Sequence, residues 1–439
     1  MLLRLVRGDR GFEQGLRRLR ARGAVTQDGK VLAQAAAIVD AVRRRGDAAL
    51  LEYTRRYDGW SPRRAADLLV PREALAGALG RLPAPLAEAL EVAAERIRRF
   101  HEVQRPHEVD LRDRFGNRLQ QRVVPVRRVG LYAPGGSARY PSTVLMTAIP
   151  ARVAGVRELT LVTPTPGGRL DDAILAAAHL SGVDRVVRVG GAQAVAALAF
   201  GTRTVPAVDL IVGPGNVYVA AAKRLVQGHV GVDMEAGPSE VVIVADASAD
   251  PEWIAADLLA QAEHDPRAMA VLVTWVPALV DAVEAALNRQ LADLPRAGIA
   301  RRALTRRGAA ILARDRADAL ALAEAFAPEH LELLIRRPRS ALGQVPSAGA
   351  VFLGPYTPEA VGDYVAGPSH VLPTAGTARF ASGLGVHHFL RYGSVIEFRA
   401  AGLRRLAGAV EALAAAEGLE AHRRAVALRT RRRGGGPER

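Results

Sequence analysis

The sequence predicts an α/β protein made of two consecutive Rossmann-like lobes, each a doubly wound and mostly parallel sheet, with helical N- and C-terminal extensions. Two observations lead to this prediction. From residue 125 to 230, short β-branched runs alternate with Ala-rich helical runs, and Gly, Pro, Ser or Asp separates them. A similar alternation begins again near residue 240. Strands and helices that alternate at this spacing form parallel sheets with right-handed crossovers.

The first alternating region contains four predicted strands, each followed by a helix. The strands are Arg128–Tyr132, Glu158–Val162, Val186–Val189 and Val208–Val212, and the helices are Ser142–Val153, Asp171–Leu180, Ala192–Phe200 and Val217–Val226. The second helix has the clearest ends, because Asp171 and Asp172 lie in its first turn and Gly182 lies just past its end.

The second region repeats the pattern. Its strands are Val241–Val244, Ala270–Thr274, Ala309–Leu312, Leu331–Ile335 and Ala350–Leu353, and its helices are Pro251–His264, Pro277–Leu291 and Ala317–Phe326. Asp250 is a good N-cap, and Pro251 suits the first helical position. Outside these regions, helices are expected at 31–44, 72–79, 85–101 and, as one or two helices, 402–428.

These elements suggest a division of the chain into five parts. We expect an N-terminal extension (1–24), one lobe of 126–238, a second lobe of 25–125 together with 239–382, a C-terminal segment (383–428) and a disordered tail (429–439).

The composition is that of an ordinary globular protein. Of its 439 residues, 49% are hydrophobic and 24% are charged, which is enough to bury a large core. The absence of cysteine excludes disulfides, Cys-based metal sites and a thiolate nucleophile, so any chemistry must use N and O ligands.

The net charge of +15 raises the question of nucleic-acid binding. The basic residues are nearly all arginines, spread in short clusters along the chain, and the aromatic residues, 5% of the total, do not interleave with them. The apolar run at the N-terminus is broken by Arg4 and Arg7, and no apolar stretch approaches the ~20 residues needed to span a bilayer. We therefore expect a soluble cytoplasmic protein without nucleic-acid or membrane partners.

Three strand-to-helix turns of the first region are rich in glycine: 133–136, 190–193 and 213–216. Such turns let a backbone approach a phosphate closely at a helix N-terminus, although none has the G-x-G-x-x-G spacing. Each alone is equally consistent with a tight turn. Together with the nearby polar residues Tyr132, Gln193 and Asn216, they favour a nucleotide crevice.

Two pairs in the second region have residue types that suit metal binding and proton transfer. Gln261 and His264 are three residues apart, so both lie on one helix face and can offer an O and an N ligand to zinc, although a helix-terminal His is also explained by the helix dipole. Glu329 and His330 can act as proton acceptors, or form a solvated turn. Asp363 and His370 lie in a loop bounded by Gly and Pro, as binding residues often do.

Taken together, these segments resemble the histidinol dehydrogenase family over residues 25–428. The matching segments are Val129–Gly136, Val212–Asn216, Asp233–Glu240, Gln261–Pro266, Ala327–Leu331 and Gly362–Thr374, with Glu417 and His422 near the C-terminus. The resemblance implies an aldehyde-dehydrogenase-like fold, an NAD-binding lobe at 126–238 and a zinc lobe formed by the rest. It also implies oxidation of L-histidinol to L-histidine through L-histidinal, the last two steps of histidine biosynthesis, with two NAD⁺ reduced.

The resemblance also implies a role for each candidate residue. One Zn²⁺ per subunit is expected on Gln261, His264, Asp363 and His422. Glu329 and His330 are the expected proton acceptors, and Tyr132, Gln193 and Asn216 the expected NAD contacts. The expected substrate contacts are Ser239, Gln261, His264, His330, Asp363, His370, Glu417 and His422. The segment 383–428 is expected to form a homodimer and to bring Glu417 and His422 into the partner's site.

Three other interpretations are open at this point. A sister dehydrogenase on the same scaffold would oxidise another small amino- or sulfo-alcohol, although a sulfonate calls for a cation near the site. A zinc hydrolase would use Glu329 to activate water but leaves the glycine-rich turns without a purpose. A basic nucleic-acid-binding protein leaves the Gln, His, Asp and Glu set unexplained.

Overall fold

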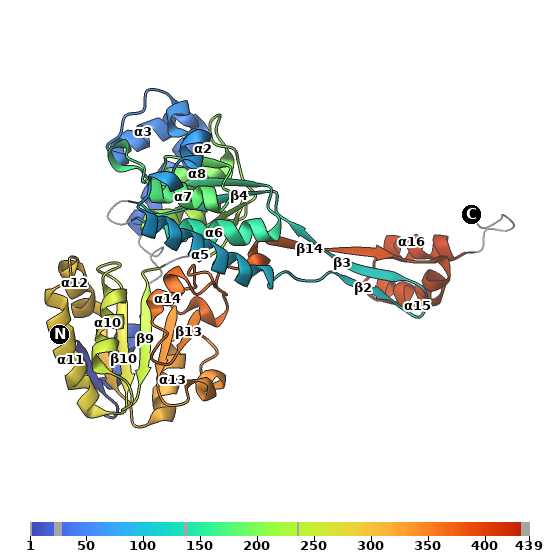
Figure 1. The fold of residues 1–439 in the computed structure, drawn as a ribbon. Coiled ribbons are helices and arrows are strands. Elements are labelled where there is room, and N and C mark those ends of the chain that lie inside the picture. The colour runs from blue at the N-terminus through green and yellow to red at the C-terminus, as the bar shows by residue number, and fades with distance from the viewer. Residues whose placement is uncertain (1, 22–28, 136–138, 235–236, 432–439) are drawn as a thin grey trace. The chain divides into compact units, whose positions relative to one another are not determined.

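The computed structural model describes residues 2–21, 29–135, 139–234 and 237–431. The chain forms two compact units, one of Met1–Gln104 with Val126–Phe389 and the other of Arg105–Pro125 with Leu390–Arg439. The first unit holds two parallel sheets, and the second holds a small antiparallel sheet (Figure 1).

The first predicted alternation is confirmed as a five-stranded parallel sheet in the order β6-β5-β4-β7-β8. The strands are β4 (Arg128–Tyr132), β5 (Glu158–Val162), β6 (Arg185–Val187), β7 (Leu210–Val212) and β8 (Gly231–Val232), and the helices between them are α6 (Pro141–Ala154), α7 (Asp172–Leu180), α8 (Gly191–Phe200) and α9 (Val217–Val226). The connections run outward from β4 to β6 and then return to β7. Neighbouring strands β4 and β7 therefore flank the point where the winding of the sheet reverses.

Helices from the N-terminal part of the chain cover this five-stranded sheet. They are α2 (Gly29–Arg45), α3 (Asp47–Asp58), α4 (Arg72–Ala76) and α5 (Ala84–Glu102). The α2 helix packs against α8 and α9, and α5 packs against α6 (Figure 1). Ile38 and Val42 of α2 share one core cluster with Ile211 of β7. This corrects the expectation that residues 25–125 pack with residues 239–382, because the apolar face of α2 is buried against the other lobe.

The second alternation is confirmed as a parallel sheet, which has six strands in the order β1-β11-β10-β9-β12-β13. Its strands are β9 (Glu240–Ala245), β10 (Met269–Thr274), β11 (Gly308–Leu312), β12 (His330–Leu334), β13 (Ala350–Leu353) and β1 (Leu3–Val6). Its helices are α1 (Phe12–Arg20), α10 (Pro251–Ala262), α11 (Pro277–Ala292), α12 (Ala297–Arg307), α13 (Arg316–Phe326) and α14 (Glu359–Tyr364). Alternate residues of β9 enter two different core clusters, so both faces of the sheet are covered.

Residues 1–24 are not a separate extension where the structure describes them. Strand β1 pairs in parallel with β11, with Leu5 opposite Ile311. Phe12, Leu16 and Leu19 of α1 are buried in the core of the same sheet. A four-residue edge strand carries too little local signal to reveal a partner about three hundred residues away.

The second unit is formed by two distant segments. Strands β2 (Val109–Arg112), β3 (Arg118–Pro125) and β14 (Leu390–Glu397) form an antiparallel sheet in the order β14-β3-β2. Helices α15 (Ala400–Ala416) and α16 (Glu420–Thr430) follow, as expected from the sequence. The C-terminal unit thus begins at Leu390 rather than at 383, and it includes 105–125.

A further difference concerns the end of the chain. Helix α16 continues to Thr430, into the segment expected to be a disordered tail, and residues 432–439 lie outside the described residues.

No helix among the described residues is long and apolar enough to cross a membrane.

Candidate active site

A cavity of about 330 Å³ lies between the two parallel sheets of the first unit. One wall comes from the carboxyl ends of β4 and β7, through Pro134, Gly135 and the turn 214–216. These two strands flank the reversal point of their sheet, where open α/β sheets bind ligands. The opposite wall comes from the amino ends of β9 and β12, through Ser239, Glu329 and His330. Opposite edges of the two sheets therefore face one another across the cavity.

The backbone around Glu329 is held firmly. Ala327 ends α13 in the left-handed conformation, with φ 43°, and turns the chain toward β12. The carbonyl of Glu329 accepts a hydrogen bond of 2.9 Å from the Ala350 N–H. A Cβ at Gly349 would lie 2.6 Å from the same carbonyl, so the close approach requires glycine there.

The Glu329 carboxyl is buried, with 6% of the residue exposed. Its Oε2 accepts the backbone N–H of Glu240 at 2.9 Å, and Ser239 hydrogen bonds to it through its side chain. Burial raises the pKa of Glu329 well above its ordinary value, and the neighbouring carboxylate of Glu240 raises it further. A carboxylate with a raised pKa is a stronger proton acceptor than one on the surface.

His330 is buried beside Glu329 at the start of β12, and its ring is set by one backbone carbonyl. Its Nδ1 lies 3.2 Å from the backbone oxygen of Glu240. Since a carbonyl only accepts, this contact favours the tautomer with the proton on Nδ1 and leaves Nε2 as the proton acceptor. Burial lowers the pKa of His330 to about 4, so the imidazole is neutral at physiological pH.

Gln261 and Glu359 form a buried pair behind this histidine. One terminal atom of the Gln261 amide lies 3.3 Å from Nδ1 of His330 and 3.0 Å from each carboxylate oxygen of Glu359. Oε1 of Glu359 also lies 3.7 Å from Nδ1 of His330. The Glu359 backbone N–H donates to Glu332 at 2.7 Å, which fixes the start of α14. Burial raises the pKa of Glu359 well above its ordinary value.

Three side chains can hold a metal ion at this place. One ligand atom from each of His264, Glu359 and Asp363 lies within 4.8 Å of the others. The Nε2 of His264 is 3.9 Å from Oδ2 of Asp363. One imidazole nitrogen and carboxylate oxygens, with the Gln261 amide close by, form a donor set that suits zinc. The residues present therefore fit the expected metal.

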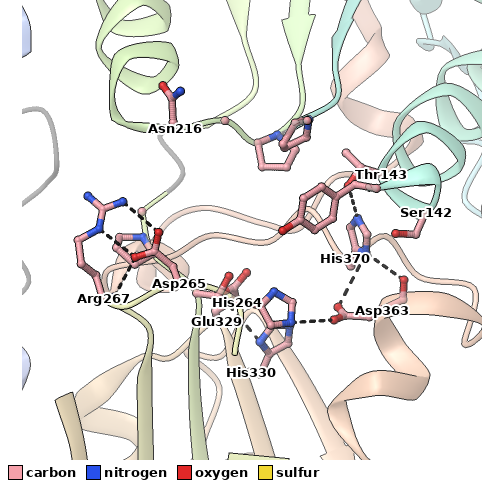
Figure 2. Close-up of a pocket in the computed structure, with 18 of the residues that line it drawn as sticks. Ser142, Thr143, Asn216, His264, Asp265, Arg267, Glu329, His330, Asp363 and His370 are labelled. Carbon is pink, nitrogen blue, oxygen red and sulfur yellow. Dashed lines mark hydrogen bonds and ion pairs between the residues drawn. The ribbon is translucent and has the colours of Figure 1, made fainter. Parts of the chain in front are cut away.

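His370 lies directly beside Asp363, one of the metal-binding side chains (Figure 2). Its Nδ1 lies 3.0 Å from the backbone oxygen of Asp363, and its Nε2 lies 3.2 Å from Oγ1 of Thr143 on α6. Figure 2 shows His264, Glu329 and His330 grouped next to this His370–Asp363 pair. The seven candidate residues of the first unit that were predicted to bind metal or substrate or to move protons are thus brought to one cavity or its immediate wall: Ser239, Gln261, His264, Glu329, His330, Asp363 and His370.

The three residues expected to contact a dinucleotide line a second cavity of about 670 Å³. The Tyr132 hydroxyl accepts the Gly191 N–H at 3.0 Å, and burial raises the pKa of Tyr132 to about 12. Gln193 is buried, and its side-chain oxygen has no hydrogen-bond partner. Asn216 caps α9, because its Oδ1 accepts from the backbone of the first turn. Asn216 lines both cavities, together with Pro134 and Gly135.

The remaining two candidates belong to the second unit. Glu417 is the C-cap of α15, His422 lies on α16, and both are exposed. The described metal cluster contains Glu359 where the sequence led us to expect His422.

Sequence reasoning missed Glu359, Glu240 and Thr143. A signal for Glu359 exists, since it precedes Asp363 by four residues and two acids at this spacing share a helix face. No sequence signal could reveal Glu240, because Glu240 contacts His330 through its backbone carbonyl, which every residue has.

Comparisons with known proteins all indicate one family. The family model for histidinol dehydrogenase matches residues 21–430. The histidinol dehydrogenase of Methylococcus capsulatus is 50% identical over 428 residues, which are 98% of each chain. That of Pseudomonas aeruginosa is 53% identical over 392 residues, which are 89% of each chain.

Solved structures give the same result. The crystal structure of histidinol dehydrogenase from Elizabethkingia anophelis has a TM-score of 0.91 and 34% identity, covering 98% of both chains. An acetylating aldehyde dehydrogenase from Geobacillus thermoglucosidasius has a TM-score of 0.50 and 14% identity over 88% of this chain and 97% of its own, and shares the fold. Two Rossmann-like lobes around a buried acid–imidazole pair define the protein as an α/β oxidoreductase. Within that class, the chain belongs to the histidinol dehydrogenase family.

Proposed function

We propose that the protein oxidises L-histidinol to L-histidine through L-histidinal, using one Zn²⁺ per subunit and reducing two NAD⁺. The observation that carries the proposal is the buried Glu329–His330 pair beside the donor set of His264 and Asp363, in a cavity that shares walls with the dinucleotide cavity. Family membership supports the choice of histidinol as substrate.

Zinc and NAD⁺ would each supply one kind of chemistry. Zinc held by Gln261, His264 and Asp363 would orient the imidazole and amine of histidinol, both of which are good ligands for this metal. NAD⁺ beside Tyr132 and Asn216 would supply the hydride acceptor.

The protein's own groups move the protons. His330, neutral and with Nδ1 directed at the Glu240 carbonyl, takes the hydroxyl proton of the alcohol at Nε2. The aldehyde must be hydrated before it can be oxidised, and the raised pKa of Glu329 suits it to take a proton from the attacking water. His330 returns its first proton to the aldehyde oxygen as the water adds, which leaves the imidazole neutral again, and it then accepts a proton from the hydrate. A thiohemiacetal route is closed, because the chain has no cysteine.

We assign the remaining contacts to substrate recognition across a homodimer. Ser239 and His370 hold the substrate from within the first unit, and Glu417 and His422 of the partner subunit complete the site. Support for a protein partner comes from large apolar side chains of the second unit that are exposed, with Ile396 69% and Leu413 66% exposed.

Stoichiometry of NADH formation tests the reaction. The metal-replete protein should form two NADH per L-histidinol, followed by absorbance, and should lose activity with EDTA and recover it with Zn²⁺. A single NADH per substrate would contradict the four-electron reaction.

Subunit mixing tests the shared site. A His422→Ala subunit and a subunit carrying Glu329→Gln and His330→Ala are each expected to be inactive alone. Hybrids formed after subunit exchange should regain activity, because one of their two sites is intact. If proven hybrids remain inactive, the two C-terminal residues do not act in the partner's site.

A second candidate is the oxidation of a small sulfo-alcohol on the same scaffold, which one observation favours. Arg267 lines the catalytic cavity and is the kind of cation that a sulfonate needs. Its Nε lies 3.0 Å from Oδ1 of Asp265, however, so its charge is already paired. Turnover of a sulfo-alcohol that is lost in Arg267→Ala, with none of histidinol, would favour this candidate.

A further inference from the structure

The dinucleotide cavity has two chemically different ends. One end is formed by Pro134, Gly135 and Asn216, which also line the catalytic cavity. Elsewhere its wall is formed by α2 and α3 and includes Ile38 and the stacked rings of Tyr53 and Tyr57, whose centroids are 5.9 Å apart. An apolar and aromatic wall suits the flat face of an adenine base. If the nicotinamide lies beside the catalytic residues, this wall takes the adenosine end.

Asp58 belongs to that wall, and one of its two carboxylate oxygens has no hydrogen-bond partner among the described residues. It is the last residue of α3, where the helix dipole disfavours a negative charge. A backbone hydrogen bond from Thr165 reaches the carboxylate, but its Oδ2 is buried without a hydrogen-bond partner. None of the described residues forms an ion pair with Asp58. Burial raises its pKa to about 6, so near neutral pH it is mainly a carboxylate.

A second buried acceptor lines the same cavity. The Oε1 of Gln193 is also without a partner, and the Gln193 residue is 1% exposed. Buried acceptors are nearly always satisfied, since an unmade hydrogen bond to a buried group is costly. Two unsatisfied acceptors that line one cavity call for a ligand with hydroxyl or amino donors.

We infer that Asp58 accepts a hydrogen bond from the 2′-hydroxyl of the adenosine ribose and thereby selects NAD⁺ against NADP⁺; this inference rests on the proposed dinucleotide role. A carboxylate favours a ribose diol and repels a 2′-phosphate, as acidic residues do in other dinucleotide sites. Arg56 also lines the cavity and could attract a phosphate, but its side chain is exposed and its guanidinium lies over the Tyr57 ring, 5.3 Å from the centroid. The more buried charge, that of Asp58, is therefore expected to decide which dinucleotide binds.

Calorimetric titration with NAD⁺ and with NADP⁺ tests the inference without relying on turnover. The variants are Asp58→Asn and Asp58→Ala, and the control is Glu52→Gln, which removes a negative charge from the same helix at an exposed position paired with Arg45. We expect the wild type to prefer NAD⁺. Both Asp58 variants should bind NAD⁺ about 10- to 100-fold more weakly and lose most of the preference, while the control keeps it.

Thermal unfolding of the ligand-free protein separates this role from a structural one. If Asp58 awaits a ligand, Asp58→Asn should unfold at the same or a higher temperature, because it removes an unpaired buried charge. A lower unfolding temperature with unchanged nucleotide preference would overturn the inference and make Asp58 a structural residue. A wild type that binds neither dinucleotide would instead refute the proposed function, and the inference with it.

Discussion

The buried ion pair between Lys223 and Asp233 offers a direct test of how the turn 213–216 is held. The Lys223 side chain is 3% exposed and that of Asp233 is not exposed at all. Lys223 donates to the Gly213 carbonyl at 3.1 Å, and Oδ2 of Asp233 accepts the Gly213 N–H at 2.7 Å. The pair therefore holds both polar groups of the residue that begins the turn 213–216.

Replacing Lys223 with Met keeps the length of the side chain and removes its charge. Asp233 would then be a buried carboxylate without a counter-charge, which costs about 3–5 kcal/mol of unfolding free energy. With a urea m-value of about 2 kcal/mol/M, the midpoint should fall by about 2 M. The double variant Lys223→Met with Asp233→Asn should recover much of this loss, because no isolated charge remains.

Trp60 provides the signal for this measurement. It packs on the core of the five-stranded sheet, and the Arg188 guanidinium lies 3.8 Å from its ring centroid. Trp253 and Trp275 belong to the six-stranded part, so replacing them with Phe in every variant leaves Trp60 as the fluorescent reporter. A midpoint of Lys223→Met within about 0.3 M of the parent would refute the reasoning, since Lys223 is the cation that forms the ion pair with Asp233.

Three further predictions follow from the site and its turns. Glu329→Gln should slow oxidation of the aldehyde by about 10²- to 10⁴-fold, measured with L-histidinal, and should affect alcohol oxidation much less; equal losses would remove Glu329 from the hydration step. Folding lowers the pKa of His330 from 6.5 to about 4, so the unfolded chain binds a proton at higher pH than the folded chain does. The metal-free protein should therefore lose about 3 kcal/mol of unfolding free energy as the pH falls from 6.5 to about 4. His330→Gln should flatten the plot of unfolding free energy against pH in this range, and an unchanged plot would contradict the burial argument. Gly213→Ala should lower the unfolding free energy by at least about 2 kcal/mol more than Gly228→Ala does. Both glycines have positive φ, but of the two only Gly213 would bring a Cβ against a backbone atom, the Tyr132 oxygen at 2.2 Å. Equal losses in urea denaturation would mean that the turn relaxes.

Much of the fold was predictable from local sequence. Strand and helix periods, the caps at Asp171 and Asp250 and the alternation of elements depend on neighbouring residues, and the structure confirms both parallel sheets. The pairing of β1 with β11 and that of β3 with β14 join residues hundreds of positions apart. Such pairings leave no local pattern, so the expected boundaries near 24 and 383 differ from those of the structure, whereas the boundary between 125 and 126 is found in both.

The candidate site divides in the same way. The sequence by itself determined which chemistry is open to this protein: no thiol, two imidazole–acid pairs and glycine-rich turns after strands. Residue types and short spacings are local properties; they made His264, Glu329 and His330 candidates, and the family resemblance implied their roles.

Only the tertiary structure decided how those groups act. It joins the carboxyl edge of one sheet to the amino edge of the other, adds Glu359 to the donor set and turns the Glu240 carbonyl toward His330. It also raises the pKa of Glu329 and lowers that of His330, because both are removed from water. Desolvation and backbone hydrogen bonds depend on what packs around a residue, and segments far apart in the chain supply that packing here.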